Sequence, residues 1–301
     1  MNAVIETQGL THCYANVAAV QDLHLSVPEG SIYAFLGPNG AGKTTTLKLL
    51  LNLLQPTGGR ASILGVDSTR LGPAEFSRIG YVSENQQLPE WMTVQQFVDF
   101  CRPMYPMWDD AFCSKMLKDF QLPPGRKLRD LSRGMKMKVA LLTSLAYRPR
   151  LLVLDEPFTG LDPIVRDEVI HGILELTEQK NWSVLISSHD IDEVERFADW
   201  VGFIDGGRLW VNESTADLCA RFKRLDCVVP AGIQPVSSSP RSWLVPEMTA
   251  RSFSVIESDY SAGKSEQQLA GMFPGATEVT ATGLSIRQIY VALAQSSRGK
   301  L

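Results

Sequence analysis

The stretch "GPNGAGKTT", Gly37–Thr45, decides how this 301-residue chain is expected to fold. It satisfies the pattern G-x-x-x-x-G-K-[ST], in which glycines let backbone N–H groups turn inward around phosphate oxygens. The apolar run Ser31–Leu36 stands directly before it and predicts a short buried strand. A helical pattern continues from Gly42 to Leu54 and ends before Pro56. Strand, glycine-rich loop and helix in this order predict a binding site for the phosphates of a nucleotide.

The parts of this loop predict different contacts with a bound nucleotide. The start of the helix adds roughly half a positive charge, which favours bound phosphate. Lys43 is expected to reach the terminal phosphates, and the Thr44 hydroxyl is expected to bind Mg²⁺. The predicted nucleotide contacts are Gly37, Pro38, Asn39, Gly40, Ala41, Gly42, Lys43, Thr44 and Thr45.

A second Gly-Lys-Ser sequence occurs in "AGKS", Ala262–Ser265. Ser258 stands where the pattern requires its first glycine, so the backbone there is not expected to wrap around phosphate. We expect a surface loop at this point.

Two acidic residues follow another apolar run, "LLVLDEP", in which Leu151–Asp155 predicts a strand. Ligands of open parallel sheets bind beyond the carboxyl ends of the strands, so Asp155 and Glu156 are expected to face the phosphates. Asp155 suits binding to Mg²⁺, usually through water, and Glu156 suits polarising an attacking water. A solvated strand end is the alternative, because alternate side chains of a strand can face outward.

Strands and helices alternate along most of the chain, which predicts an α/β fold with a mostly parallel sheet. The segment Thr93–Phe120 is helical and aromatic, opens with a capping box and is broken by two prolines. We therefore expect an inserted helical subdomain at about residues 88–147, which includes a helix from about Ser132 to Tyr147. A further helix is expected to open at Asp162, and Phe203–Val211 predicts a β-hairpin.

The composition changes after Phe222, where a stretch rich in Pro and Ser begins. We expect a domain boundary near residue 223, with the main domain over residues 1–222 and a small accessory domain over residues 223–301. The second is expected to be of α+β type and to end in a helix near Ser285–Ala294.

Charge and cysteine content limit the classes of partner and the compartment that the chain is expected to have. The chain has 29 Lys and Arg against 33 Asp and Glu, a net charge of −4, so it lacks the basic excess expected for nucleic-acid binding. Its 5 cysteines are scattered without a C-x-x-C pair, which predicts reduced thiols in a cytoplasm. Neither an export signal nor a run of 18 apolar residues is found, so membrane contact is expected only through another chain.

Five more stretches occur in a particular order around the phosphate loop. They are Tyr14, 23 residues before Gly37; Glu84 in "IGYVSE"; Leu131, Ser132 and Gly134 in "LSRGM"; Gly160–Asp162 in "GLD"; and His189 in "ISSHD". Over roughly Val4–Phe222, this order and spacing resembles the ATP-binding cassette (ABC) family of transport ATPases.

The resemblance implies an ATP-hydrolysing subunit of a membrane transporter, with a P-loop NTPase core, an antiparallel β subdomain and an inserted helical subdomain. Cassettes of the family pair head to tail, as a homodimer or with a second nucleotide-binding subunit, and they dock on a transmembrane permease. Such a chain is cytoplasmic and peripheral on the inner face of the cell membrane.

By the same resemblance, residues of this chain take specific roles. Tyr14 stacks on adenine, and Ser132 and Gly134 close over the ATP that the partner cassette holds. Glu84 joins Thr44 and Asp155 at Mg²⁺. The catalytic residues are then Glu156, His189 and Lys43.

The chain departs from the family pattern at three positions. Glu84 stands where the family usually has glutamine and adds negative charge beside Asp155 and Glu156. Arg133 replaces a glycine and is expected to point to solvent rather than to phosphate. Met135 replaces a glutamine and cannot make its hydrogen bonds. A Gly-Tyr-x-x-Glu loop with a Leu-Ser-x-Gly-Met signature resembles the exporter branch that extrudes antibiotics, lipids and peptides.

Two other readings stay open at this point. One is a soluble cassette ATPase without a transport role, although such proteins commonly carry two cassettes. The other is a regulatory nucleotide-binding module with weak hydrolysis. The aromatic residues from Trp91 to Phe120 are expected to pack a helical core, and Trp91 or Tyr105 to line a groove for a permease helix.

Overall fold

The structure, a computed structural model, describes residues 2–84, 86–177, 182–236 and 239–298. Its contacts divide the chain into two compact units, Met1–Asn212 and Glu213–Leu301. The division falls ahead of α7 (Thr215–Arg221), whereas the sequence pattern suggested a boundary near residue 223. In the described part of the chain, no helix has both the length and the apolar character needed to cross a bilayer.

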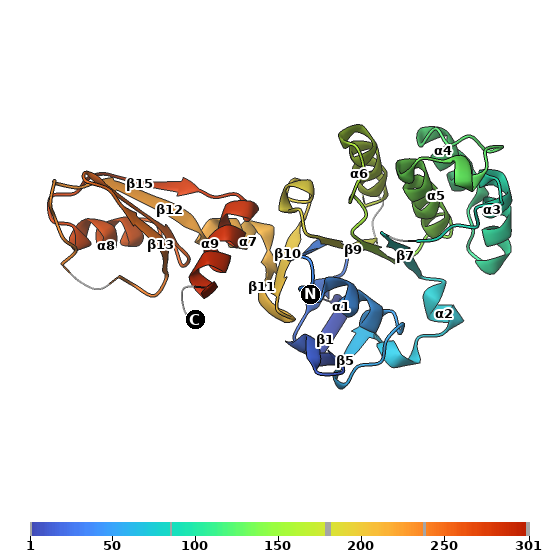
Figure 1. Cartoon of the computed structure of the whole chain (residues 1–301), viewed down its shortest axis with the longest axis horizontal. Helices are drawn as coiled ribbons and strands as arrows, with labels where there is room; N and C mark the ends of the chain where they lie inside the picture. The colour runs from blue at the N-terminus through green and yellow to red at the C-terminus, as the bar shows by residue number, and fades with distance from the viewer. Residues whose placement is uncertain (1, 85, 178–181, 237–238, 299–301) are drawn as a thin grey trace. The chain divides into compact units, whose positions relative to one another are not determined.

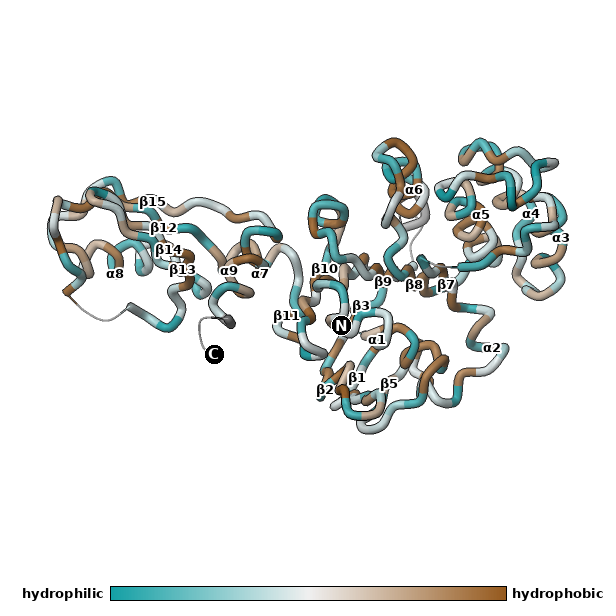
Figure 2. Tube along the Cα trace, viewed as in Figure 1, coloured by the Kyte–Doolittle hydropathy of each residue, from teal (hydrophilic) through white to brown (hydrophobic). Residues whose placement is uncertain are grey.

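The main sheet of the first unit has the order β11-β10-β4-β9-β8-β7, and the neighbours from β10 to β7 run parallel. Every residue of β4, β8 and β9 is buried, as expected for parallel strands covered on both faces. In Figure 2 the segments labelled β8 and β9 carry the hydrophobic colour. Their bounds are β4 Ile32–Leu36, β7 Ile79–Ser83, β8 Leu151–Asp155, β9 Ser183–Ser188, β10 Trp200–Asp205 and β11 Arg208–Ser214. The predicted mostly parallel α/β sheet is confirmed.

A second, antiparallel sheet forms at the beginning of the chain, in the order β2-β1-β5-β6 with β3 paired to β1. Helix α1 (Lys43–Leu50) shares one apolar core with both sheets, to which Leu10, Phe35 and Leu47 all belong. The strands are β1 Ala3–Tyr14, β2 Val17–Leu23, β3 Ser26–Pro28, β5 Gly58–Ile63 and β6 Val66–Asp67. The predicted antiparallel β subdomain is therefore present, although α1 ends four residues before the predicted Leu54.

Helices α3, α4 and α5 group together at one end of the first unit (Figure 1). The capping box at α3 is confirmed, because the Thr93 hydroxyl accepts from the Gln96 N–H at 3.2 Å and the Gln96 side chain accepts from the Thr93 N–H at 2.9 Å. The helices after β6 are η1 Ser68–Arg70, α2 Pro73–Phe76, α3 Val94–Cys101, η2 Arg102–Met104, α4 Asp110–Asp119, η3 Leu128–Asp130 and α5 Arg133–Leu145.

Two helical segments follow the strands that carry the predicted acidic and histidine residues. Helix α6 (Pro163–Thr177) opens as predicted, with the Asp162 carboxylate accepting from the Val165 N–H at 3.1 Å. After β9 only one 3₁₀ turn forms, η4 (Ile191–Glu193), capped by Asp190. The main chain therefore leaves the carboxyl ends of β8 and β9 in short, well-anchored turns.

The second unit is α+β, as predicted. An antiparallel sheet in the order β13-β14-β12-β15 packs an apolar core with α8 that includes Phe253, Leu269 and Phe273. Its elements are α7 Thr215–Arg221, β12 Lys223–Val228, β13 Trp243–Met248, β14 Ser252–Glu257, α8 Lys264–Met272, β15 Thr277–Gly283 and α9 Ile286–Arg298.

The prediction of a surface loop at Ala262–Ser265 was right for Ala262 and Gly263, which form an exposed turn, and wrong for the two residues after them. Gly263 precedes α8 with φ of +77°, and Lys264 and Ser265 already belong to the helix. The Ser265 side chain is buried and its hydroxyl accepts from the Ser261 N–H at 3.0 Å. A serine that bonds back to the preceding turn starts a helix here, and the sequence reading overlooked this local signal.

Candidate functional site

The loop between β4 and α1 requires glycine at specific points. A Cβ on Gly37 would lie 2.1 Å from the Ile204 carbonyl oxygen, and one on Gly42 would lie 2.4 Å from the Ala19 carbonyl oxygen. Gly42 also has φ of 106° and caps α1 without any side-chain hydrogen bond. Backbone packed this tightly forms a fixed cradle at a helix N-terminus, which is a binding site for anions.

Lys43 lies inside this cradle with only 4% of its surface exposed. Its Nζ donates to the carbonyl oxygens of Gly37 at 2.6 Å and Pro38 at 3.1 Å. It also lies 3.1 Å from Glu156 Oε1, an ion pair that lacks the geometry of a hydrogen bond. The ammonium is thus buried against the loop, where a terminal phosphate would find a positioned positive charge.

Asp155, the last residue of β8, is joined to the loop by the Thr44 hydroxyl, which donates to Asp155 Oδ1 at 3.0 Å. The Ser187 hydroxyl donates to the same oxygen at 2.7 Å. Burial raises the pKa of Asp155, and these two hydrogen bonds oppose that rise. A hydroxyl and a carboxylate side by side are oxygen donors suited to Mg²⁺, which usually takes one or two carboxylates together with nucleotide phosphates.

Among the described residues, no group of three or more His, Cys, Asp or Glu side chains is arranged to hold a metal ion by itself.

Glu156 follows Asp155 in a left-handed conformation, with φ of 51°. Such a value is uncommon outside glycine and costs roughly 1–3 kcal/mol where it occurs at functional sites. The Glu156 N–H donates to the Ser187 hydroxyl at 3.0 Å, which helps to hold the turn. Its carboxylate then lies between Lys43 and His189, because Oε2 is 2.7 Å from His189 Nδ1. This turn directs two consecutive acids to different partners.

His189 is 39% exposed and therefore has both a carboxylate partner and access to solvent. Its neighbour Ser188 is buried and donates to Glu193 Oε2 at 3.2 Å, while Arg166 of α6 donates to Glu193 Oε1 at 3.1 Å. Burial raises the pKa of Glu193, with the Arg166 hydrogen bond opposing the rise. These contacts anchor the segment that carries His189 to α6.

The sequence analysis missed Ser187, Thr159 and Glu193 as supporting residues. Ser187 bonds both acids, and the Thr159 hydroxyl donates to Glu156 Oε2 at 3.2 Å. A signal was present, because consecutive serines end the otherwise apolar run of β9. Buried hydroxyls at the carboxyl end of a parallel strand are expected to have polar partners.

Tyr14 ends β1 and is 46% exposed. It pairs with Val17 next to the turn of the β1–β2 hairpin, and the same β2 strand supplies the Ala19 carbonyl that packs against Gly42. The Tyr14 ring meets the His12 ring edge to face, with centroids 4.6 Å apart. The hairpin that carries the aromatic therefore borders the phosphate loop.

A second cluster of predicted residues forms at the start of α5. Ser132 caps this helix, and its hydroxyl accepts from the Met135 N–H at 3.2 Å. A Cβ on Gly134 would lie 2.6 Å from Val165 Cγ1 of α6, so the glycine also has a packing reason within the chain. Arg133, expected to point to solvent, is half exposed but lies 3.2 Å from Glu84 Oε1.

The structure thus gathers the predicted residues into two groups. Lys43, Thr44, Asp155, Glu156 and His189 are linked by direct contacts around the loop. The second group is at the start of α5, where Glu84 bonds Arg133.

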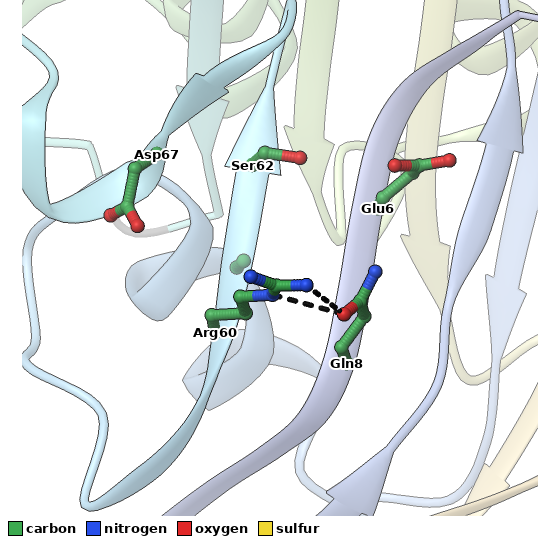
Figure 3. Close-up of a pocket in the computed structure, with 6 residues that line it drawn as sticks. Glu6, Gln8, Arg60, Ser62 and Asp67 are labelled. Atoms are coloured by element: carbon green, nitrogen blue, oxygen red, sulfur yellow. Dashed lines mark hydrogen bonds between the residues drawn. The ribbon is translucent and has the colours of Figure 1, made fainter.

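Figure 3 shows a different polar hollow, of about 260 Å³, on the antiparallel sheet. Arg60 donates to Gln8 Oε1 through Nε at 2.9 Å, and Asp67 caps η1, where hydrogen bonds from Thr69 lower the pKa of its carboxyl. Glu6, Gln8, Arg60 and Asp67 are exposed, and none of them belongs to the two groups above. We interpret this hollow as the solvated face of β1, β5 and β6.

The chain matches a known protein family. The family described as "ABC transporter" matches residues 20–159, and an AAA domain described as a putative AbiEii toxin of a type IV toxin–antitoxin system matches residues 124–195. The first match includes the phosphate loop, both acids and the start of α5.

Curated relatives are similar over most of their length. The ABC transporter ATP-binding protein YtrB of Bacillus subtilis is 30% identical, with 68% of this chain and 70% of the relative covered. The bacitracin transport ATP-binding protein BcrA of Bacillus licheniformis is 34% identical, with 69% of each covered. The daunorubicin/doxorubicin resistance ATP-binding protein DrrA of Streptomyces peucetius is 35% identical, with 71% of this chain and 66% of the relative covered.

Solved structures show the same fold. An ATP-binding subunit of an ABC transporter superposes with a TM-score of 0.66 at 26% identity, with 72% of this chain and 92% of that chain covered. A dimeric bacterial ABC transporter cassette superposes with a TM-score of 0.63 at 23% identity, covering 70% of this chain and 98% of that chain. The extent of these similarities, with the loop, acids and histidine in contact, shows that this chain belongs to the ABC transporter family as one of its ATP-binding subunits.

Proposed function

We propose that this chain hydrolyses ATP as one half of a head-to-tail pair and so powers an exporter in the cell membrane. The observation that carries the proposal is the contact chain Lys43–Glu156–His189, set beside the Thr44–Asp155 hydrogen bond. It combines a buried cation, a metal-binding pair and an acid held against a histidine at one helix start. Phosphoryl transfer to water needs these elements, because it depends on positioning and charge stabilisation.

In this proposal each residue has a defined task. Lys43 binds the terminal phosphates, and Thr44 with Asp155 holds Mg²⁺, which would neutralise developing charge on the phosphate oxygens. Glu156 orients and polarises the attacking water through the oxygen that faces His189. Groups of this kind, aimed at developing charge, are each worth about 10²–10³ in rate.

The head-to-tail pairing is supported by the start of α5. Ser132 and Gly134 stand at a helix N-terminus outside the Lys43 group, in a position to serve another nucleotide. In Figure 1, α1 and α5 lie on opposite sides of the main sheet. The proposed pair is either a homodimer or a complex with a second nucleotide-binding subunit, and the dimeric cassette described above offers a precedent for the fold.

A groove on the helical end of the first unit supports a permease partner. This cavity of about 360 Å³ is lined mainly by aromatic and aliphatic residues, with a few polar ones such as Gln86, and Tyr105 stacks on Tyr147 inside it with ring centroids 3.7 Å apart. Phe100, half exposed, and Leu53, 56% exposed, lie on α3 and after α1. Trp91, also expected to line the groove, is 69% exposed and is not part of it. We propose that a short amphipathic helix of the permease binds here.

The relatives suggest the class of cargo, and the permease partner suggests the location. The bacitracin and drug-resistance relatives point to export of antibiotics or similar amphipathic molecules. Docking on a permease would place the chain at the inner face of the cell membrane. A regulatory module without turnover would bind ATP but not hydrolyse it, and a cassette ATPase without a transport role would not copurify with a membrane-spanning chain.

The decisive experiment replaces Glu156 with glutamine. We expect E156Q to bind ATP normally, to lose turnover by at least about a hundredfold, and to accumulate as an ATP-bound dimer in size-exclusion chromatography. A monomeric E156Q that hydrolyses ATP at the normal rate would overturn the assigned role.

The pairing is tested by S132R, which should leave ATP binding by the isolated chain unchanged and abolish hydrolysis that depends on pairing. S214R is its matched control, because Ser214 caps α7 as Ser132 caps α5, through the Asp217 N–H at 3.1 Å. Each substitution removes a helix cap worth about 1 kcal/mol, so the two should lose similar stability. If S132R and S214R lost hydrolysis equally, the loss would come from removing a helix cap and not from disturbing the interface of the head-to-tail pair.

A further inference from the structure

Two residues at which this chain departs from the family pattern contact each other. Glu84 follows β7, and Arg133 is the first residue of α5. Arg133 Nη2 lies 3.2 Å from Glu84 Oε1, and the two side chains are 52% and 33% exposed. The two side chains carry opposite charges and form an ion pair between the loop after β7 and the start of α5.

Glu84 occupies a place where an unpaired carboxylate would be costly. Ser83 lies directly beside Asp155 in the parallel β7–β8 pair, so the chain leaves β7 at the edge that carries Asp155 and Glu156. Both of those acids are buried. A carboxylate at this edge adds negative charge on the side of the sheet where the phosphates of a bound nucleotide would lie.

Arg133 is held toward its own chain rather than free in solvent. A Cβ on Gly160 would lie 2.8 Å from Arg133 Nη1 and 3.1 Å from its Cζ, so the guanidinium lies directly on the Gly160 backbone. Gly160 belongs to the turn between Glu156 and α6 and has φ of 70°. One arginine therefore joins the start of α5 to the loop after β7 and to the turn after the catalytic acid.

We propose that Arg133 is a positioning residue that acts through Glu84. It offsets the extra carboxylate at the phosphate-binding edge and ties the start of α5, with Ser132, to that edge. Removing Arg133 is therefore harmful while Glu84 is charged and is not harmful once Glu84 has been made neutral. The inference rests on the proposed function, since it concerns the same phosphate site.

The chain offers a matched control in a second ion pair between the same elements. Lys136 of α5 lies 3.4 Å from Glu90 of the segment after β7, with exposures of 34% and 69%. Neither residue belongs to a predicted nucleotide contact. Removing the Lys136–Glu90 ion pair, as in K136Q, therefore measures any general effect of loosening α5 from the segment after β7.

The test measures the equilibrium dissociation constant of MANT-ATP for the full chain, in EDTA at 50 mM and 500 mM NaCl. At low salt we expect R133Q to weaken binding by about three- to tenfold, because one negative charge is left uncompensated. In the E84Q background, R133Q should change the dissociation constant by less than about twofold, because no carboxylate charge is then left uncompensated. At high salt the loss in R133Q should shrink below about twofold, since partly exposed charges are screened. R133K and K136Q should stay within twofold throughout.

Three results would overturn the inference and leave the proposed function standing. An equal loss from R133Q with and without E84Q would show that Arg133 binds phosphate directly. An unchanged R133Q would show that the pair has no role in binding, and a tenfold loss in R133K would show that shape rather than charge matters. Failure of the unsubstituted chain to bind MANT-ATP would overturn the proposed function itself, and this inference with it. Thermal unfolding of each variant confirms that the comparison is made between folded proteins.

Discussion

The chain contains the sequence Gly-Lys-Ser/Thr twice, at Gly42–Thr44 and at Gly263–Ser265, and the two copies begin helices in the same way. In each, the glycine has positive φ, 106° and 77°, and precedes the first helical residue without a side-chain cap. The helices are of similar length, 8 and 9 residues. A glycine with positive φ before the first helical residue therefore does not by itself distinguish a nucleotide site from an ordinary helix.

The two copies differ in what surrounds their lysine and their hydroxyl residue. Lys43 is buried against loop carbonyls and Glu156, whereas Lys264 is exposed. The Thr44 hydroxyl donates to an acid at the end of a parallel strand, whereas the Ser265 hydroxyl accepts from its own turn. What makes the first copy a binding site is thus the preceding loop and the acid beside it, which the second copy lacks.

The largest expected difference between the copies is in nucleotide affinity. K43A should weaken MANT-ATP binding by about a thousandfold or more, since it removes a buried charge that makes charge-assisted hydrogen bonds. K264A removes an exposed charge and should leave the dissociation constant within about twofold. Equal losses measured by fluorescence titration would contradict the assignment of the site to the first copy alone.

A smaller difference is expected in stability. G42A places a methyl group 2.4 Å from the Ala19 carbonyl oxygen in addition to forcing alanine into positive φ, so something must shift. We expect a loss of about 2–4 kcal/mol in the free energy of unfolding. At Gly263 no atom lies within 4 Å of the added Cβ, so G263A should cost only the backbone term, about 1 kcal/mol.

Urea unfolding of the full chain measures the loss in free energy of unfolding for G42A and for G263A. The unfolding of each unit is followed by its own spectroscopic signal. If G263A were as damaging as G42A, backbone conformation alone would explain the requirement for glycine, and the close approach of β2 to the loop would have no energetic role.

The comparison also explains what the sequence could and could not predict. The loop, β8 and the capping box at Thr93 depend on neighbouring residues, so pattern alone located them. The left-handed turn at Glu156, the contact of Gly134 with Val165 and the pairing of Glu84 with Arg133 depend on segments distant in the chain. No local pattern specifies such contacts, and this is why Arg133 was expected to point to solvent.

The smallest expected effect is on the pH dependence of stability. It comes from the carboxylate beside each copy, Asp155 for the first and Glu266 for the second, and its sign differs between the two. A hydrogen bond from Tyr260, at 2.6 Å, lowers the pKa of Glu266 below its usual 4.5. A lowered pKa in the folded state contributes stability above the unfolded value, and this contribution is lost as pH falls through the folded value. Asp155 behaves oppositely, because burial raises its pKa above 3.8, so its ionisation costs stability in the nucleotide-free chain as pH rises.

Melting temperatures of the nucleotide-free full chain between pH 3 and pH 7 test both signs. At pH 7 we expect E266Q to melt lower than the unsubstituted chain by up to about 2 °C and D155N to melt higher, because each amide removes the effect of the charge. Both differences should vanish toward pH 3, where the carboxyls are protonated. A D155N variant that melts lower at pH 7 would mean that the ionised Asp155 stabilises the empty loop through Thr44 and Ser187, and that burial does not dominate its energetics.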